Sequence, residues 1–253
     1  MIIGDEGLII IDTTETTKAA ENILTEFRKI TSKPVTTIIY THSHRDHISG
    51  ATVFAEGNQV EIIASDNFES DLVAIDDRHP SPNKALMART KRQFGMGLSF
   101  PDERVSVGVG PGDRPMQGMG AGYIEPTVLM HDAQTSISRN GITLSLVKAP
   151  GETPDHLVIW YDERQMLFCG DNFYSSFPML YAIRGTAYRD FNAWADSLDL
   201  LLEFNASILA TGHTMPVVGA EEVKARLSDY RDCLLYTSPS PRDKRQSRMP
   251  SSA

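Results

Sequence analysis

The feature that most constrains the fold is an apolar run, Val35–Tyr40, that leads directly into a cluster of histidines and an aspartate. Runs of this kind, without polar alternation, are typical of strands that are covered on both faces. Three of the 7 histidines in the 253 residues then follow within a few positions, at His42, His44 and His47, together with Asp46. The sequence therefore predicts a buried strand that ends in a chemically active turn.

The spacing within this turn indicates two cation sites. His42 and His44 are two residues apart in extended backbone, so both imidazoles project the same way and can meet one cation. Asp46 and His47 are adjacent at the expected start of a helix, where neighbours diverge by about 100° and can reach a second cation. Two divalent ions about 3.5–4 Å apart are what a two-metal hydrolytic site requires. The alternative, exposed histidines on a polar loop, fits single histidines better than this set.

Elsewhere, short apolar runs alternate with helical patterns, which predicts an α/β fold with sheets layered between helices. Thr14 and Asp190 are the predicted caps of two helices, and residues 162–164 are a predicted hairpin turn. The predicted strands are 7–12, 35–40, 60–64, 142–148, 156–161, 165–169 and 207–211, and the predicted helices are 16–30, part of 83–94, 191–204 and 221–231.

Composition narrows the function class. The hydrophobic content of 41% and charged content of 23% are ordinary for a globular protein. A net charge of −9 argues against non-specific nucleic-acid binding but leaves room for a small anionic substrate in a local cationic pocket. Apolar runs stay below the ~20 residues of a membrane span. Two cysteines, Cys169 and Cys233, do not make a disulfide framework.

The turn THSHRDH resembles the signature of the metallo-β-lactamase superfamily. This resemblance implies the four-layer αββα sandwich of that family and further ligands downstream. In APGETPDH, Glu152 stands where the family usually has a histidine; in LFCGDN, Asp171 stands at its bridging carboxylate; in LATGHTMP, His213 stands at its last histidine ligand.

The implied ligand set contains seven residues around two ions. One ion is assigned to His42, His44 and Glu152, the other to Asp46, His47 and His213, with Asp171 bridging them and a water or hydroxide between. Asp46 and Asp171 are also the predicted catalytic residues. Nitrogen and carboxylate ligands suit Zn²⁺, two per chain, with manganese or iron as alternatives.

Two further residues near the ligands have predicted supporting roles. Asp12 is predicted to orient a ligand histidine. His156 is interpreted either as a similar support or, by preference, as a packed histidine.

The segments GETPDHLVIW and GDNFYSSFPMLYAIRGTAYRD resemble the alkylsulfatase branch, the SDS-hydrolase-like linear alkylsulfatases. The resemblance spans most of the chain to about Asp232 and implies hydrolysis of alkyl sulfate esters to alcohol and sulfate. It also implies substrate-binding roles for Arg184, Arg189 and Arg89, since a guanidinium can hold a sulfate through paired hydrogen bonds. Arg92 and Phe94 depart from an aromatic pair of the family.

A glycine-, proline- and methionine-rich stretch, residues 100–125, interrupts the strand and helix pattern. A loop of this length inside a compact domain is usually functional or disordered. Met116 and Met119 are predicted either to line a channel for an alkyl chain or to lie in a disordered lip.

Both ends suggest a fragment. Residues 1–232 are predicted to be a catalytic domain that lacks its first strands, and residues 233–253 a disordered tail. The tail resembles translated read-through of a sequencing adapter. Alkylsulfatases of this kind carry a helical dimerisation domain and a sterol-carrier-like domain, so the full-length parent is expected to be a homodimer. Its compartment is left open, with a periplasmic or secreted protein as one expectation, because an export signal would precede Met1.

Two rival functions stay open at this point. The first is another hydrolase of the superfamily, acting on a lactone, a thioester or a β-lactam. The second is a non-catalytic metal-binding domain. The sequence also leaves open the preferred alkyl chain and whether the S–O or the C–O bond is cleaved.

Overall fold

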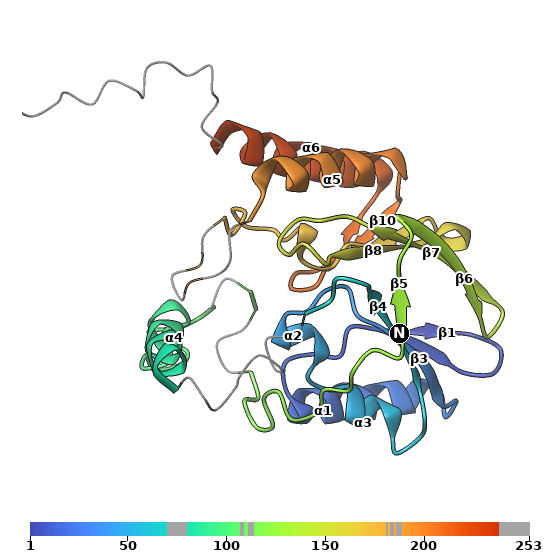
Figure 1. The fold of residues 1–253 in the computed structure, drawn as a ribbon, viewed down its shortest axis with the longest axis horizontal. Coiled ribbons are helices and arrows are strands. Elements are labelled where there is room, and N and C mark those ends of the chain that lie inside the picture. Colours follow the sequence, from blue (N-terminus) through green and yellow to red (C-terminus); the bar gives the residue numbers. More distant parts are fainter. Residues whose placement is uncertain are drawn as a thin grey trace, which may run out of the picture.

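The computed structural model describes residues 1–69, 80–106, 109–110, 114–180, 182, 185 and 189–237. They form two facing β-sheets between two outer layers of helices (Figure 1). The predicted α/β class and αββα layering are confirmed.

The first sheet has the strand order β1-β2-β3-β4-β5. All its neighbouring strands are parallel except β1 and β2, which form a short antiparallel pair. Parallel strands bring their carboxyl ends to one edge of a sheet, and this edge carries the histidine turn. The strands are β1 (Ile2–Ile3), β2 (Leu8–Ile11), β3 (Val35–Ile39), β4 (Glu61–Ser65) and β5 (Val128–Met130).

The second sheet has the order β11-β10-β9-β8-β7-β6 and is antiparallel except for the parallel pair β9 and β10. A 3₁₀ turn over Asp162–Arg164 joins β8 to β9, as the predicted hairpin requires. The strands are β6 (Gln134–Arg139), β7 (Ile142–Lys148), β8 (Leu157–Tyr161), β9 (Met166–Phe168), β10 (Ile208–Ala210) and β11 (Val217–Val218).

Helices cover the outer face of each sheet. The helices α1 (Thr17–Ile30) and α3 (Ala51–Ala55) lie on the first sheet, and α5 (Phe191–Glu203) and α6 (Ala220–Thr237) lie on the second (Figure 1). The short helix α2 (Arg45–Ile48) follows β3 at the sheet edge, and α4 (Pro80–Gln93) lies beside the sandwich (Figure 1).

The strands of the first sheet are buried on both faces, which explains their continuous apolar runs. Leu8 and Ile10 of β2 pack in the cluster that includes α1 and α3. Ile9, between them, points to the opposite face and packs with Leu144 and Ile159 of the second sheet. Side chains alternate between faces along a strand, so one run of isoleucines serves two cores.

Two details of the sequence prediction change, and one is confirmed. Thr16 rather than Thr14 caps α1, because its side chain accepts from the backbone N–H of Ala19. The predicted cap Asp190 is confirmed on α5. The strands β1, β5, β6 and β11 were not predicted, because β1, β5 and β11 are very short and β6 (QTSISR) is largely polar.

The C-terminal helix crosses the predicted domain boundary. Helix α6 continues through Thr237, and Leu234 within it is fully buried against the core of α5 and α6. Leu234 therefore packs with the domain, although it lies beyond the predicted boundary at residue 232, and the tail from 238 lies outside the described residues. Among the helices that the structure describes, none has the length and apolar character needed to cross a bilayer.

Candidate metal centre

The seven predicted ligands come from loops that follow strands of both sheets and meet at one edge of the sandwich. Four lie in the turn after β3, and Glu152, Asp171 and His213 follow β7, β9 and β10. They form two groups, each with donor atoms within 4.8 Å of one another. The grouping is the one expected from the sequence, including Asp171 as a member of both groups.

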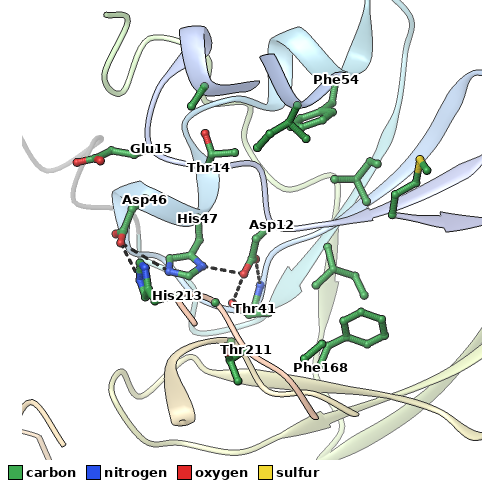
Figure 2. A pocket seen from close by; sticks show the side chains of 18 of the residues that line it. Asp12, Thr14, Glu15, Thr41, Asp46, His47, Phe54, Phe168, Thr211 and His213 are labelled. Carbon is green, nitrogen blue, oxygen red and sulfur yellow. Dashed lines mark hydrogen bonds and ion pairs between the residues drawn. The ribbon is translucent and has the colours of Figure 1, made fainter. Parts of the chain in front are cut away.

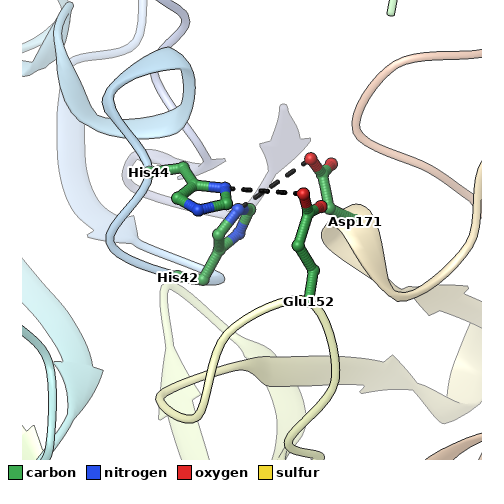
Figure 3. Close-up of side chains that lie close together, drawn as sticks. All are labelled: His42, His44, Glu152 and Asp171. Atoms are coloured by element: carbon green, nitrogen blue, oxygen red, sulfur yellow. Dashed lines mark ion pairs between the residues drawn. The ribbon is translucent and has the colours of Figure 1, made fainter. Parts of the chain in front are cut away.

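The first cluster contains His42, His44, Glu152 and Asp171 (Figure 3). His42 Nε2 lies 3.9 Å from Asp171 Oδ2, and His44 Nδ1 lies 3.9 Å from Glu152 Oε1. Bonds of about 2.0–2.2 Å to a tetrahedral Zn²⁺ place neighbouring ligand atoms about 3.3–3.6 Å apart. The two separations of 3.9 Å are a few tenths of an ångström wider, so a small inward movement of the side chains would close them on an ion.

The second cluster contains Asp46, His47, Asp171 and His213. His213 Nε2 lies 3.1 Å from Asp46 Oδ2 and 3.0 Å from Asp171 Oδ2, and His47 Nε2 lies 3.3 Å from Asp171 Oδ1. Figure 2 shows Asp46, His47 and His213 turned toward one another. Asp171 is thus in position to bridge two ions.

Asp12 fixes the orientation of His47. Its Oδ2 lies 2.7 Å from His47 Nδ1, and its carboxylate also accepts from the backbone N–H and the hydroxyl of Thr41 (Figure 2). A carboxylate accepts hydrogen bonds and has no proton to donate, so the proton of this bond is on Nδ1 of His47. The other ring nitrogen of His47, Nε2, is directed to the second cluster. The hydrogen bond expected from Asp12 to a ligand histidine is present.

His156 contacts two ligands of the first cluster, His42 and Asp171. It is fully buried, its ring stacks on His42 with centroids 4.7 Å apart, and its Nε2 accepts from the backbone N–H of Asp171. Burial lowers the pKa of His156 to about 3, so the ring is neutral. His156 thus combines the two roles considered: it is a packed histidine that also positions the bridging residue.

The electrostatics of the first cluster favour a cation. Burial lowers the pKa of His42 well below its usual range and that of His44 to about 4. Burial and the neighbouring Asp171 raise the pKa of Glu152 well above its usual range, although Arg189 opposes this shift. Neutral imidazoles beside two close carboxylates are the donor groups that a divalent ion binds.

In the second cluster, the positive charge of protonated histidines offsets the negative charge of the neighbouring carboxylates. Burial, the largest single effect, would lower the pKa of both histidines, but the carboxylates around them, Asp171 foremost, together outweigh it, so the pKa of His47 lies well above its usual range and that of His213 rises to about 10. Burial would raise the pKa of Asp46 and Asp171, but the two histidines hold both pKa values below the usual range.

The residues fit a pair of metal ions. His42 Nε2 and Glu152 Oε2 are buried and have no hydrogen-bond partner among the described residues. Leaving a buried polar atom without a hydrogen-bond partner costs free energy of folding. Both atoms belong to side chains of the first cluster, whose ligand atoms lie within 4.8 Å of one another. Asp12 and His156 provide the supporting hydrogen bonds that metal ligands usually have.

A glycine precedes each of the three downstream ligands, and this local signal was available in the sequence. A Cβ on Gly212 would lie 2.3 Å from Asp171 Oδ1, and a Cβ on Gly170 would lie 2.7 Å from His156 Cε1. Gly170 also has a φ of +50°. The dipeptides Gly-Glu, Gly-Asp and Gly-His therefore mark places where the chain passes too close to the site for a side chain.

The three predicted substrate arginines lie in different surroundings. Arg184 lies outside the described residues. Arg89 is exposed on α4, with its Nη2 3.5 Å from the position of a Cβ on Gly185. Arg189 is buried, with 4% of its surface exposed, and contacts Glu152.

A cavity of about 400 Å³ opens beside the second cluster (Figure 2). Its polar end is formed by Asp46, His47 and His213, and its walls include Phe54 and Phe168. The remaining apolar lining comes chiefly from β2 and α1.

Two charged residues of this cavity, Glu15 and Arg114, were not predicted from the sequence. They form an ion pair of 2.8 Å. Arg114 also lies over the ring of Phe94, 5.6 Å from its centroid. Because Glu15 and Arg114 are far apart in the sequence, no local pattern predicts their contact.

A methionine of the loop over residues 100–125 also lies near the site. Thr16 and Met119 form an isolated β-bridge, and the Met119 sulfur lies 3.8 Å from Arg45 Nη1. Met116 is 41% exposed. A channel for an alkyl chain along these methionines stays a prediction.

Known proteins resemble this chain in sequence and in structure. A family model described as the metallo-β-lactamase superfamily matches residues 1–213. A linear primary-alkylsulfatase from Pseudomonas sp. (strain ATCC 19151) is 34% identical over 93% of this chain and 45% of the relative. The alkyl/aryl-sulfatase BDS1 from Saccharomyces cerevisiae is 31% identical over 92% of this chain and 37% of the relative.

Among solved structures, the stereoselective inverting sec-alkylsulfatase Pisa1 from Pseudomonas sp. superposes with a TM-score of 0.75 at 26% identity, over 93% of this chain and 38% of that chain. The present chain spans less than half the length of each of these three proteins.

Proposed function

Because the chain belongs to the metallo-β-lactamase superfamily, we propose that it is a dinuclear zinc hydrolase that cleaves alkyl sulfate esters to an alcohol and sulfate. The observation that carries the proposal is the pair of ligand clusters that share Asp171. Its substrate class is supported by the likeness to proteins named as alkylsulfatases from a bacterium and a yeast.

The first cluster would hold one ion through His42, His44 and Glu152, and the second would hold the other through Asp46, His47 and His213. When bound, two ions of this kind supply Lewis acidity and a nucleophilic water at neutral pH. The chain's own residues orient these ligands, as Asp12 does for His47.

Substrate recognition would use charge at one end and apolar surface at the other. A sulfate ester is an anion, and a guanidinium donates paired hydrogen bonds to such a group, so we assign sulfate binding to Arg184 and, more peripherally, to Arg89. The cavity beside the second cluster has apolar walls, including Phe54 and Phe168, that would accept part of an alkyl chain.

Turnover by the zinc-loaded chain tests the proposal. We expect sulfate release from dodecyl sulfate at a submicellar concentration, and loss of this activity in His42→Ala. The matched control is His131→Ala, because the side chain of His131 is 76% exposed and outside the clusters. Hydrolysis of a β-lactam or a thioester without hydrolysis of dodecyl sulfate would contradict the substrate class and favour the rival hydrolase.

A further inference from the structure

Arg189 makes its closest charged contact with a candidate metal ligand. Its Nη2 lies 2.7 Å from Glu152 Oε1, and the two side chains are 3% and 6% exposed. A second nitrogen of the same guanidinium, Nη1, donates to the backbone carbonyl of Met179. The guanidinium is therefore held between a carboxylate and a carbonyl, in a region from which water is largely excluded.

This contact leaves one oxygen of Glu152 available. Oε1 contacts Arg189 and also lies 3.9 Å from His44 Nδ1, whereas Oε2 is buried and has no hydrogen-bond partner among the described residues. A carboxylate that is fixed through one oxygen has a defined direction for the other. The arrangement resembles that of His47, whose Nδ1 is engaged by Asp12 while its Nε2 faces the second cluster.

The backbone of Arg189 is itself fixed by the start of α5. The next residue, Asp190, is the N-cap of this helix, and its side chain accepts from the N–H groups of Asn192 and Ala193. An N-cap with two such hydrogen bonds stabilises the first turn of a helix. Arg189 therefore projects from an anchored position, not from the middle of a loop.

The same helix also holds the loops on either side of Glu152. The Ser197 hydroxyl donates to the carbonyl of Pro150, and the Trp194 indole N–H donates to the carbonyl of Asn172. Asn172 in turn accepts from the backbone N–H of Glu152. Helix α5 thus holds the loops of the first cluster through the side chains of Ser197 and Trp194, and Arg189, directly before its N-cap, contacts the carboxylate itself.

Resting on the metal site of the proposed function, we propose that Arg189 is a positioning residue that orients the Glu152 carboxylate and so sets the zinc affinity of the first cluster. Arg189 acts through Glu152 and does not bind the sulfate of the substrate. This revises the substrate-binding role expected from the family resemblance. The guanidinium is buried against Glu152 and Met179, and Arg189 is not among the residues that line the cavity of the second cluster.

Zinc titration of the full chain tests this role without any substrate. Zn²⁺ affinity would be measured against a chromophoric chelator for the unsubstituted chain, Arg189→Met, Glu152→Gln and the double variant. Loss of a residue that orients a metal ligand typically costs about 10–100-fold in metal affinity, and we expect this loss for one of two ions in Arg189→Met. In the Glu152→Gln background, Arg189→Met should have little further effect, because its target is gone.

The control is Arg139→Met, which breaks another arginine–glutamate pair, with Glu61 at 2.7 Å, away from the clusters. It should leave zinc affinity unchanged. If Arg189→Met does not fold, Arg189→Lys keeps the charge and one donor and should lose less than about tenfold. An unchanged or raised affinity in the folded Arg189 variants overturns the positioning role, as does an equal loss with and without Glu152.

These outcomes are separable from failure of the proposed function. If the unsubstituted chain binds no zinc, the metal hydrolase proposal fails together with the role of Arg189 in it. If the chain binds two ions and Arg189→Met binds them equally well, only the positioning role fails. Sulfate ester turnover decides neither result, since the titration contains Zn²⁺ alone.

Discussion

The two metal clusters share Asp171 but differ in their access to the surface. Ligand side chains of the first cluster are at most 16% exposed and are backed by His156 and Arg189. In the second cluster, the side chain of Asp46 is 31% exposed, and the cluster forms one end of a cavity. We infer that the first cluster serves mainly to hold and orient an ion, and that substrate approaches through the second.

The largest expected effect comes from the residue that the clusters share. Asp171→Asn keeps the shape of the side chain but removes the charge, so we expect loss of both ions and of hydrolysis. Zinc content per chain, measured by elemental analysis after gel filtration, checks this. Asp199→Asn is the control, since Asp199 lies in an exposed ion pair with Arg231. Retention of two ions by Asp171→Asn would contradict the bridge.

Ligands that belong to one cluster should each affect one ion. His42→Ala is expected to empty the first cluster and His213→Ala the second, each with a loss of at least about 100-fold in the affinity for that ion. The same zinc analysis should then give about one ion per chain in each variant. Loss of both ions in both variants would mean that the clusters do not bind independently.

The supporting residue Asp12 should have a smaller effect that is confined to the second cluster. Asp12→Asn removes the charged acceptor of His47 Nδ1, so zinc affinity of the second cluster should fall by about 10–100-fold. Titration of this variant with Zn²⁺ should show one unchanged and one weakened site. Two equally weakened sites would indicate a general loss of structure, which circular dichroism would reveal.

The clusters should also differ in pH dependence. The pKa of His213 is raised to about 10 and that of His47 lies well above its usual range, so zinc must displace a proton from both at pH 7. In the first cluster the pKa of His44 is lowered to about 4, and only Glu152, whose pKa is raised, has a proton to lose. The variant His42→Ala keeps only the second cluster. Its zinc affinity should rise with pH, by up to about tenfold per pH unit for each proton that zinc displaces. His213→Ala should bind zinc with a flatter pH profile between pH 6 and 9. Equal slopes in the two variants would contradict the difference in protonation.

The sequence predicted the parts of the site that are local. His42, His44, Asp46 and His47 lie in one turn after a recognisable strand, and alternation along that strand is enough to direct two of them to one ion. The layers of the fold were predictable for the same reason, since apolar runs such as β3 are local patterns.

Contacts across the fold were predictable only through family resemblance or not at all. Glu152, Asp171 and His213 have no local pattern that brings them to the histidine turn, and the motifs of the family supplied their places. The contact of Arg189 with Glu152 depends on how α5 sits over the second sheet. The same holds for Arg114 and Glu15, whose pairing depends on the path of a long loop.

The most direct test of the account is anomalous diffraction at the zinc absorption edge from crystals of the zinc-loaded chain. Two anomalous peaks about 3.5–4 Å apart, one beside His42 and His44 and one beside His47 and His213, with Asp171 between them, are the predicted result. A single peak, or peaks away from Asp171, would contradict the shared dinuclear centre.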